Sequence, residues 1–176
     1  LTAHTSWVTS AVFSPNGKIM ATAGDDKVVR LWDVADPARP KPIGQPLNGN
    51  NGTIYSVSFS VDGKTIATAN DDHTVRLWDV SNPVNPLPLQ PLQGHTAPVR
   101  SVDFSPNGKT LASAGNDRVV RLWDVTNPAQ PVLLGTPLTG NNDIVHSVTF
   151  SHDSRMLATA GEDKTVRLWN VTDPAH

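Results

Sequence analysis

Arg30-Leu31-Trp32-Asp33-Val34 is the stretch that decides the fold, because it occurs four times in a chain of 176 residues. The same five residues return at 76–80 and at 121–125, and a fourth copy at 167–171 carries Asn170 in place of the aspartate. The tryptophans of these copies are spaced by 46, 45 and 46 residues, at Trp32, Trp78, Trp123 and Trp169. A constant spacing of this size is typical of a repeated structural unit.

Each copy ends a series of short apolar runs that are separated by turn signals. In the first repeat, residues 7–13, 19–23 and 28–34 are predicted strands, joined by a Pro-Asn-Gly turn at 15–17 and a Gly-Asp-Asp-Lys turn at 24–27. A proline-rich link leads to a fourth predicted strand at 43–47. Proline cannot donate to a β-ladder, so this strand is expected at the outer edge. Later repeats follow the same order, with fourth strands predicted at 87–92 and near 132–138.

The inner predicted strands carry apolar residues in both alternating positions, which indicates a sheet covered on both faces. A covered four-stranded sheet that recurs every ~45 residues predicts an all-β fold of β-propeller blades of four antiparallel strands. A β-sandwich of hairpins is the alternative. We expect one domain of four blades, the last without its outer strand, at approximately 1–47, 48–92, 93–138 and 139–176.

A second period joins the repeats in pairs. Repeats one and three share Pro-Asn-Gly-Lys, repeats two and four share Thr-Val-Arg-Leu-Trp, and the tryptophans of each pair are 91 residues apart (32 to 123, 78 to 169). Four blades are not expected to close a ring. The arrangement we favour is a homodimer in which a second chain completes an eight-bladed ring; a fragment of a longer array and a compact four-bladed ring are the alternatives.

The composition excludes several classes of function. The net charge of −2 does not suggest a nucleic-acid groove, and the absence of cysteine excludes disulfides, thiolate metal sites and a cysteine nucleophile. No apolar run approaches the ~18 residues that would span a bilayer, and no signal peptide is visible. We therefore expect no nucleic-acid partner, no membrane association and a cytoplasmic location.

These residues identify the chain as similar to the WD-repeat β-propeller family over essentially its whole length. The resemblance to that family implies that each blade contains a hydrogen-bonded set of four residues: a His, a Ser or Thr, an Asp and a Trp. Ten residues before each tryptophan stand Thr22, Thr68, Ser113 and Thr159. Six before it stand Asp26, Asp72, Asp117 and Asp163. The histidine position holds His4 and His95 in the odd repeats, but Asn50 and Asn141 in the even ones.

The two asparagines are expected to change the network. A neutral imidazole donates from one nitrogen and accepts at the other, whereas an asparagine side chain is shorter. The resemblance therefore implies a complete set in blades one and three and a broken or water-bridged set in blades two and four. Histidine at both positions is expected to raise the melting temperature.

The same His, Ser and Asp invite a catalytic-triad interpretation. Their repetition argues for scaffolding instead, since an active site is normally built once, and no Gly-x-Ser-x-Gly elbow is present. The carboxylate pairs at 25–26 and 71–72 are interpreted as turns, and the other histidines lack metal-ligand spacing. We expect no catalytic residue, no metal, no cofactor and no enzyme activity.

Positions that vary within the repeated frame are the candidates for partner contacts. In resembling propellers they lie around the mouth of the channel, and aromatic residues and arginine are favoured interface anchors. The candidates are Trp7, Thr9, Tyr55, Arg100, Ile144 and His146; ordinary drift at exposed positions is the alternative. The predicted function is a non-enzymatic protein–protein interaction scaffold, with partners of unknown identity, similar to bacterial WD-repeat arrays. The alternative is a structural repeat unit whose main property is self-assembly into a closed ring.

Overall fold

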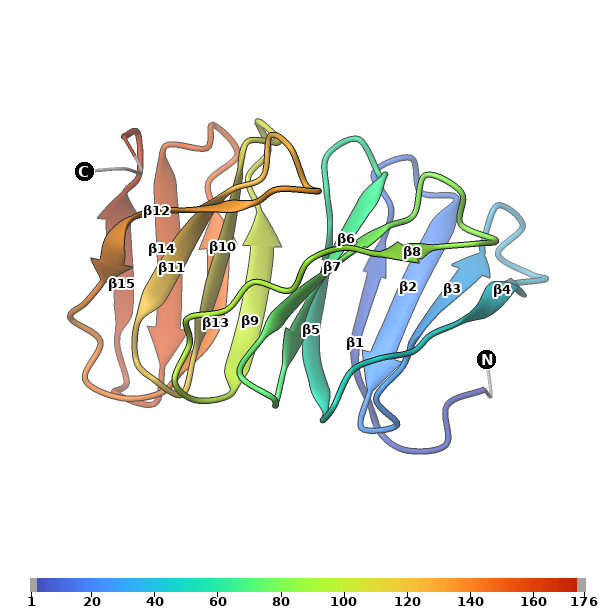
Figure 1. The fold of residues 1–176 in the computed structure, drawn as a ribbon, viewed down its shortest axis with the longest axis horizontal. Coiled ribbons are helices and arrows are strands. Elements are labelled where there is room, and N and C mark those ends of the chain that lie inside the picture. Colours follow the sequence, from blue (N-terminus) through green and yellow to red (C-terminus); the bar gives the residue numbers. More distant parts are fainter. Residues whose placement is uncertain (1–2, 174–176) are drawn as a thin grey trace.

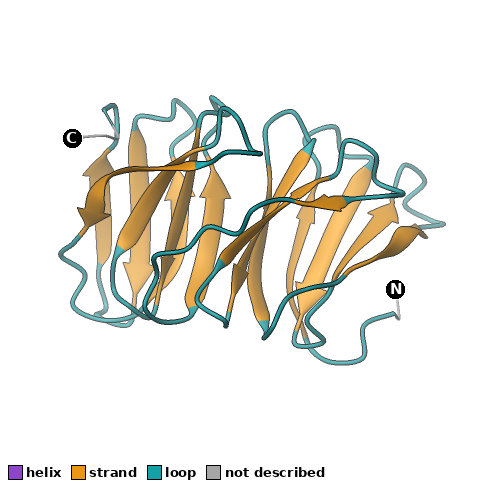
Figure 2. Ribbon diagram, viewed as in Figure 1, coloured by secondary structure: helices purple, strands orange, loops and turns teal. Residues whose placement is uncertain are grey.

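The computed structural model describes residues 3–173, and this part of the chain folds into fifteen strands in four antiparallel sheets. No helix is present among these residues (Figure 2). The described residues therefore contain no helix that is long and apolar enough to cross a membrane. The all-β architecture predicted from the sequence is confirmed.

Each sheet is built from strands in chain order and corresponds to one blade. Blade one contains β1 (Val8–Phe13), β2 (Ile19–Gly24), β3 (Val29–Asp33) and β4 (Lys41–Leu47). Blade two contains β5 (Ile54–Phe59), β6 (Thr65–Asn70), β7 (Val75–Asp79) and β8 (Leu87–Pro88). Blade three contains β9 (Val99–Phe104), β10 (Thr110–Gly115), β11 (Val120–Asp124) and β12 (Val132–Leu138). Blade four contains β13 (Val145–Phe150), β14 (Met156–Gly161) and β15 (Val166–Asn170).

The four blades stand side by side in an open row. Blade one lies at the blue end and blade four at the red end, so the two ends of the chain lie at opposite ends of the row (Figure 1). The first strands β1, β5, β9 and β13 contact one another in succession along the row. This arrangement fits a segment of a propeller.

The hydrophobic core lies between consecutive blades. Val29 and Leu31 of β3 face the second blade and pack in one cluster with Ile54, Val57 and Trp78. Equivalent clusters join blades two and three, and blades three and four. This packing explains why both alternating positions of the inner strands are apolar: the sheets of blades two and three are covered by a neighbour on each face, and those of blades one and four on one face.

Hydrogen bonds from the first strands also join the blades. The Val57 N–H donates to Ser10 Oγ at 3.1 Å, and the Val148 N–H donates to Ser101 Oγ at 3.1 Å. Each first strand pairs with its second strand on one side only, so its other edge carries backbone donors without ladder partners. Side chains of the preceding blade accept hydrogen bonds from some of these donors. A backbone N–H inside a protein requires such a partner.

Two kinds of glycine have distinct roles. Gly17 has φ 69° in the turn between β1 and β2, where its N–H donates to Ser14 O at 2.8 Å. This is the predicted Asn-Gly turn, and glycine reaches positive φ without steric penalty. Gly115 ends β10 against the backbone before β9, where an added Cβ would lie 2.1 Å from the Pro98 carbonyl oxygen. The close approach of two backbones leaves no space for a side chain there.

Two predicted strands differ from the structure. The fourth strand of blade two was expected over 87–92, but β8 spans Leu87–Pro88 and only an isolated bridge joins Leu92 to Val75. Proline alone does not explain the break, because β4 is continuous across Pro42 and Pro46. The segment 87–92 differs in that it lacks the glycine of positive φ that β4 has at Gly44 and β12 at Gly135. Trp7 was expected in the first strand but lies before it, with 82% of its surface exposed.

Candidate functional site

In blade one, four side chains form a continuous hydrogen-bonded set. The Trp32 indole N–H donates to Thr22 Oγ1 at 2.8 Å, and His4 Nε2 lies 2.7 Å from the same oxygen. His4 Nδ1 lies 2.9 Å from Asp26 Oδ2. These distances fit an imidazole that donates to the carboxylate and accepts from the hydroxyl. The set ties the segment before β1 to β2, to the following turn and to β3.

Blade three repeats this geometry. The Trp123 indole N–H donates to Ser113 Oγ at 2.9 Å, and His95 lies 2.8 Å from both Ser113 Oγ and Asp117 Oδ2. Burial raises the pKa of Asp117, but the hydrogen bonds from His95 and from the Thr96 and Val119 N–H groups outweigh it and hold that pKa below its ordinary value. Asp26 has a lowered pKa for the same balance of causes, with burial opposing the bonds from His4 and Thr5.

In blade two the corresponding residues are not joined. The Asn50 Nδ2 donates to Lys27 O at 3.2 Å, whereas its Oδ1 is buried without a hydrogen-bond partner. The Trp78 indole N–H is also buried and has no partner. Asp72 instead accepts from Arg76 at 2.8 Å, and the bonds from Thr74 and Arg76 outweigh burial and lower its pKa.

Blade four is intermediate. The Trp169 indole N–H donates to Thr159 Oγ1 at 3.1 Å, and that hydroxyl donates to Asn141 Oδ1 at 3.2 Å. Asn141 does not reach Asp163, because its amide donates to Arg118 O at 3.3 Å. Asp163 accepts instead from Thr165, the Asn142 N–H and Arg167, and such bonds lower its pKa to about 2.

Sequence reasoning missed Asn70, which also belongs to the second blade's site. Asn70 is fully buried, and its amide donates to Thr68 Oγ1 at 3.2 Å and to Thr74 O at 3.0 Å. In blade one the equivalent hydroxyl, that of Thr22, contacts His4. The available signal was that the other repeats have glycine here, at 24, 115 and 161. The Asn70 amide thus makes in blade two the contact with the Ser/Thr hydroxyl that histidine makes in blades one and three.

Asn141→His is expected to stabilise the chain by about 1 kcal/mol, or ~3 °C in melting temperature, by adding a link to Asp163. Asn50→His is expected to give no gain, because the Asn70 amide already bonds to Thr68 Oγ1. The sequence alone predicts a gain at both positions, and the structure restricts it to Asn141. Calorimetry of both variants checks this. An equal gain at the two positions would contradict it.

Acid is expected to destabilise the chain through Asp26 and Asp117. Both carboxyls have folded-state pKa values below 3.8. A lowered pKa contributes stability that is present above the unfolded-state pKa and is lost as the pH falls through the folded-state value. Urea unfolding between about pH 5 and pH 3 should show the loss, with a shallower dependence in Asp117→Asn. An identical slope for the variant would exclude Asp117 as a source.

The His95, Ser113 and Asp117 geometry resembles that of a catalytic triad. Ser113 is fully buried, and its hydroxyl oxygen already accepts the Trp123 indole N–H. The Ser113 hydroxyl is therefore closed to a substrate carbonyl in this structure. We therefore interpret the four-residue sets as supports of the blades. Among residues 3–173, no group of three or more His, Asp or Glu side chains has an arrangement that could hold a metal ion.

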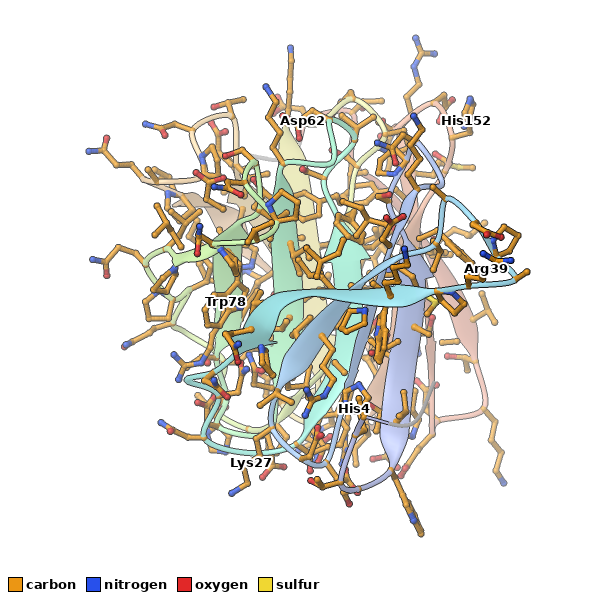
Figure 3. All side chains as sticks on the ribbon, turned by 90° about the vertical axis from the view of Figure 1, so that its right-hand side faces the viewer. His4, Lys27, Arg39, Asp62, Trp78 and His152 are labelled. Atoms are coloured by element: carbon orange, nitrogen blue, oxygen red, sulfur yellow. The ribbon has the colours of Figure 1, made fainter. Side chains whose placement is uncertain are left out.

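The variable residues gather at one end of the blades. Tyr55 donates to Asp71 at 2.8 Å, Arg100 to Asn116 at 2.7 Å, and His146 lies 2.9 Å from Glu162. Each pair is 16 residues apart and joins a first strand to the turn after the second strand of its own blade. Figure 3 shows this end at the bottom, near Lys27 and His4, and the opposite end near Asp62 and His152. We call these six residues, with Trp7, the rim surface.

The partner candidates differ in their contacts and exposure. The Arg100 guanidinium stacks over the Tyr55 ring at 4.0 Å, which links blades two and three on the rim. The Thr9 hydroxyl donates hydrogen bonds to the backbone oxygens of Ala23 and Ile54. Ile144 is partly exposed, and its carbonyl accepts the Glu162 N–H. Tyr55, Arg100 and His146 thus each form an equivalent pair with a turn residue of their own blade. Trp7 protrudes at the end of the row.

Comparison with known proteins agrees with the repeated geometry. The family model described as WD domain, G-beta repeat matches residues 1–33, 41–79, 87–124 and 132–170. The chain belongs to the WD40 repeat family. Its four matches correspond to the four blades of the structure.

Individual relatives resemble this WD40 chain over about one repeat. Nuclear distribution protein nudF 2 of Penicillium rubens is 44% identical over 39 residues, which is 22% of this chain and 8% of that protein. Nuclear distribution protein PAC1 of Meyerozyma guilliermondii is 49% identical over 35 residues, or 20% of this chain and 7% of that protein. The matched part thus spans less than a tenth of either relative.

Proposed function

We propose that this chain is a non-enzymatic protein-interaction scaffold that binds a partner protein through the rim surface. The observation that carries the proposal is the set of three pairs, Tyr55–Asp71, Arg100–Asn116 and His146–Glu162. The backbone frame and the 16-residue separation are constant, whereas the side chains differ in every blade. Such an array presents a distinct chemistry at each blade while its geometry is held by the blades.

The rim offers both apolar and charged contacts. Trp7 supplies a large exposed aromatic surface at blade one, and Tyr55 with Arg100 supplies a stacked aromatic and cationic surface at blades two and three. Side chains of these types dominate the binding energy of protein interfaces. Asp71, which pairs with Tyr55, and Glu162, which pairs with His146, are exposed acids on the same surface. A partner segment with aromatic or aliphatic anchors and both signs of charge would fit this surface.

Matched variants on the two ends of the row test the proposal. Proteins captured from a lysate by the unaltered chain are compared with those captured by Trp7→Ala/Tyr55→Ala/Arg100→Ala. The control is Lys18→Ala/Lys64→Ala/Lys109→Ala, on the turns at the opposite end. Partners lost by the rim variant and kept by the control are the expected result. Loss in both variants or in neither would place binding elsewhere.

A second candidate function is self-assembly into an eight-bladed ring by two copies joined head to tail. The outward face of blade four exposes 71% of Val166 and 68% of Leu168, whereas Val29 and Leu31 in the same positions of blade one are buried. The outward face of blade one exposes Val8 and Phe13. Internal interfaces join faces of these two kinds, so a second copy would bring complementary surfaces together. The blade limits expected from the sequence are part of this proposal.

Sedimentation distinguishes this candidate from the first. A dimer of the 18.8 kDa chain is expected for the unaltered protein. Leu168→Glu should give a monomer, because a charge would replace a side chain in the joined face. Lys164→Glu, an exposed change on the turn before β15, is the control and should remain dimeric. A monomer at all concentrations would remove the ring proposal and leave the rim proposal untouched. A cytoplasmic location and a bacterial origin stay predictions.

A further inference from the structure

Four asparagines of the chain precede a glycine, at 16, 48, 51 and 107. Such a pair can lose the side-chain amide, because glycine has no side chain that keeps its backbone N–H away from the asparagine Cγ. The glycine nitrogen bonds to this carbon and gives up its proton, with which the amide leaves as ammonia. Water then opens the resulting succinimide ring to aspartate or to isoaspartate, in which the main chain runs through the side-chain carbons. The reaction requires an asparagine that is free to turn toward the following N–H.

Asn16 is held on both sides of the bond that would form. Its Oδ1 accepts from the Ser14 hydroxyl at 2.8 Å and from the Lys18 N–H at 2.9 Å. The Gly17 N–H, which would attack, donates to Ser14 O at 2.8 Å. Asn107 has the same three bonds in the equivalent turn of blade three. These bonds have to break before either asparagine reacts.

Asn51 is the least restrained of the four. The Asn48 amide donates to Pro46 O at 3.0 Å, which turns that side chain back along the chain and away from the following N–H. The Asn51 side chain is exposed and makes no hydrogen bond with residues 3–173. The Gly52 N–H likewise donates to no acceptor among these residues. No bond of either kind therefore opposes the reaction at Asn51.

The cause lies in the hydrogen-bonded set of blade two. In the other blades, the residue that follows the His or Asn of the set donates its backbone N–H to the turn aspartate. These bonds are Thr5 to Asp26 at 3.2 Å, Thr96 to Asp117 at 3.2 Å and Asn142 to Asp163 at 3.1 Å. In blade two this residue is Asn51, and Asp72 accepts from Arg76 instead. The segment that carries Asn51 is thus the one that its turn aspartate does not hold.

This segment lies against the rim surface. A Cβ added at Gly52 would be 2.7 Å from Asp71 Cβ and 3.2 Å from Asp71 Oδ2. Asp71 accepts the Tyr55 hydroxyl at 2.8 Å. A carboxylate on residue 51 would therefore stand beside Asp71. Isoaspartate would in addition lengthen the main chain by one carbon and move Gly52 against the same side chain.

We propose that Asn51 is a site of spontaneous deamidation, which adds a negative charge to the rim surface beside the Tyr55–Asp71 pair. The reactants are the Asn51 amide, the Gly52 N–H and water, and ammonia is released. The folded chain selects this site by holding Asn16, Asn48 and Asn107 and leaving Asn51 free. The modification does not depend on the function proposed for the rim surface.

Incubation of the intact chain in mildly alkaline buffer, followed by peptide mass spectrometry, tests the site. Deamidation at Asn51 should be at least about tenfold faster than at Asn16 and Asn107, because each hydrogen bond that has to break slows the reaction several-fold. The chain dissolved in urea is the reference. There the bonds are absent, so all four pairs should react at similar rates. Asn51→Thr, which has the residue of blades one and three, should leave the other three rates unchanged.

Two aspartate variants test the effect on the rim surface. Asn51→Asp should shift the ring signals of Tyr55 in NMR spectra, as should prolonged incubation of the unaltered chain. Asn107→Asp is the matched control at the opposite end and should leave these signals in place. The turn accepts an aspartate there, since Asp62 takes the Ser60 hydroxyl at 2.6 Å in the equivalent position of blade two.

Equal rates at Asn51 and Asn16 in the folded chain would overturn the selection of this site. So would slowing of Asn51, relative to its rate in urea, by as much as Asn16 is slowed. Tyr55 signals that stay in place in Asn51→Asp would refute the effect on the rim surface. None of these measurements uses a partner protein, so a failure to capture one leaves their outcome unchanged.

Discussion

His95→Asn is expected to lower the free energy of unfolding by about 3 kcal/mol, because it removes two hydrogen bonds from a buried set, one of them to a carboxylate. His95 is 7% exposed and contacts Ser113 and Asp117 at 2.8 Å each. The shorter asparagine would leave the buried side of Asp117 without its partner. Blade three would then resemble blade two, where Asn50 Oδ1 and the Trp78 indole N–H lack partners. Urea unfolding monitored by circular dichroism measures the change.

Asn50→Ala is the matched control at the same position of blade two. It should lower the free energy of unfolding by less than about 1 kcal/mol, because Asn50 donates a single bond of 3.2 Å. The indole signal of Trp123 should move in His95→Asn and stay in Asn50→Ala. Equal losses in the two variants would show that the complete set contributes nothing beyond an ordinary polar side chain.

Gly115→Ala is expected to destabilise the chain by about 3 kcal/mol, at the upper end of the effect of overpacking. The added Cβ would lie 2.1 Å from the Pro98 carbonyl oxygen and 2.8 Å from the Val99 Cα, both of which are backbone atoms. Neither can turn away as a side chain would. The β9–β10 ladder, whose register already shifts between Ala114 and Gly115, would have to separate. Thermal and urea unfolding both report the effect.

Gly17→Ala separates this steric effect from backbone conformation. Gly17 has φ 69°, but no atom lies within 4 Å of an added Cβ. Its loss should therefore be about 1 kcal/mol, which is the penalty of the left-handed region for an L-residue. A Gly115→Ala loss no larger than that of Gly17→Ala would mean that the two backbones separate easily.

Local residue patterns were sufficient to predict the blades. The Asn-Gly turn at 16–17 has the positive φ that its residues favour, and the paired apolar positions of Val29 and Leu31 face a neighbouring blade. The outer position of the fourth strands follows from their prolines, since β4, β8 and β12 each pair on one side only. Each of these features depends on residues close in sequence or repeated at one spacing.

The candidate sites required the folded chain. Tyr55 and Asp71 have no sequence relation that predicts a hydrogen bond, and the stacking of Arg100 on Tyr55 joins residues of different blades. Asn70 stands where the other repeats have glycine, but its hydrogen bond to Thr68 Oγ1 exists only in the folded chain.

The sequence by itself determined the repeat, the four blades and the difference between His4 and Asn50, because strand periodicity and turn residues act over short distances. Only the tertiary structure decided which polar atoms of these sets meet and which apolar faces are covered. Those properties depend on how neighbouring blades and strands approach one another in space, and Val166 shows this directly: its type matches Val29, yet only Val29 has a blade beside it.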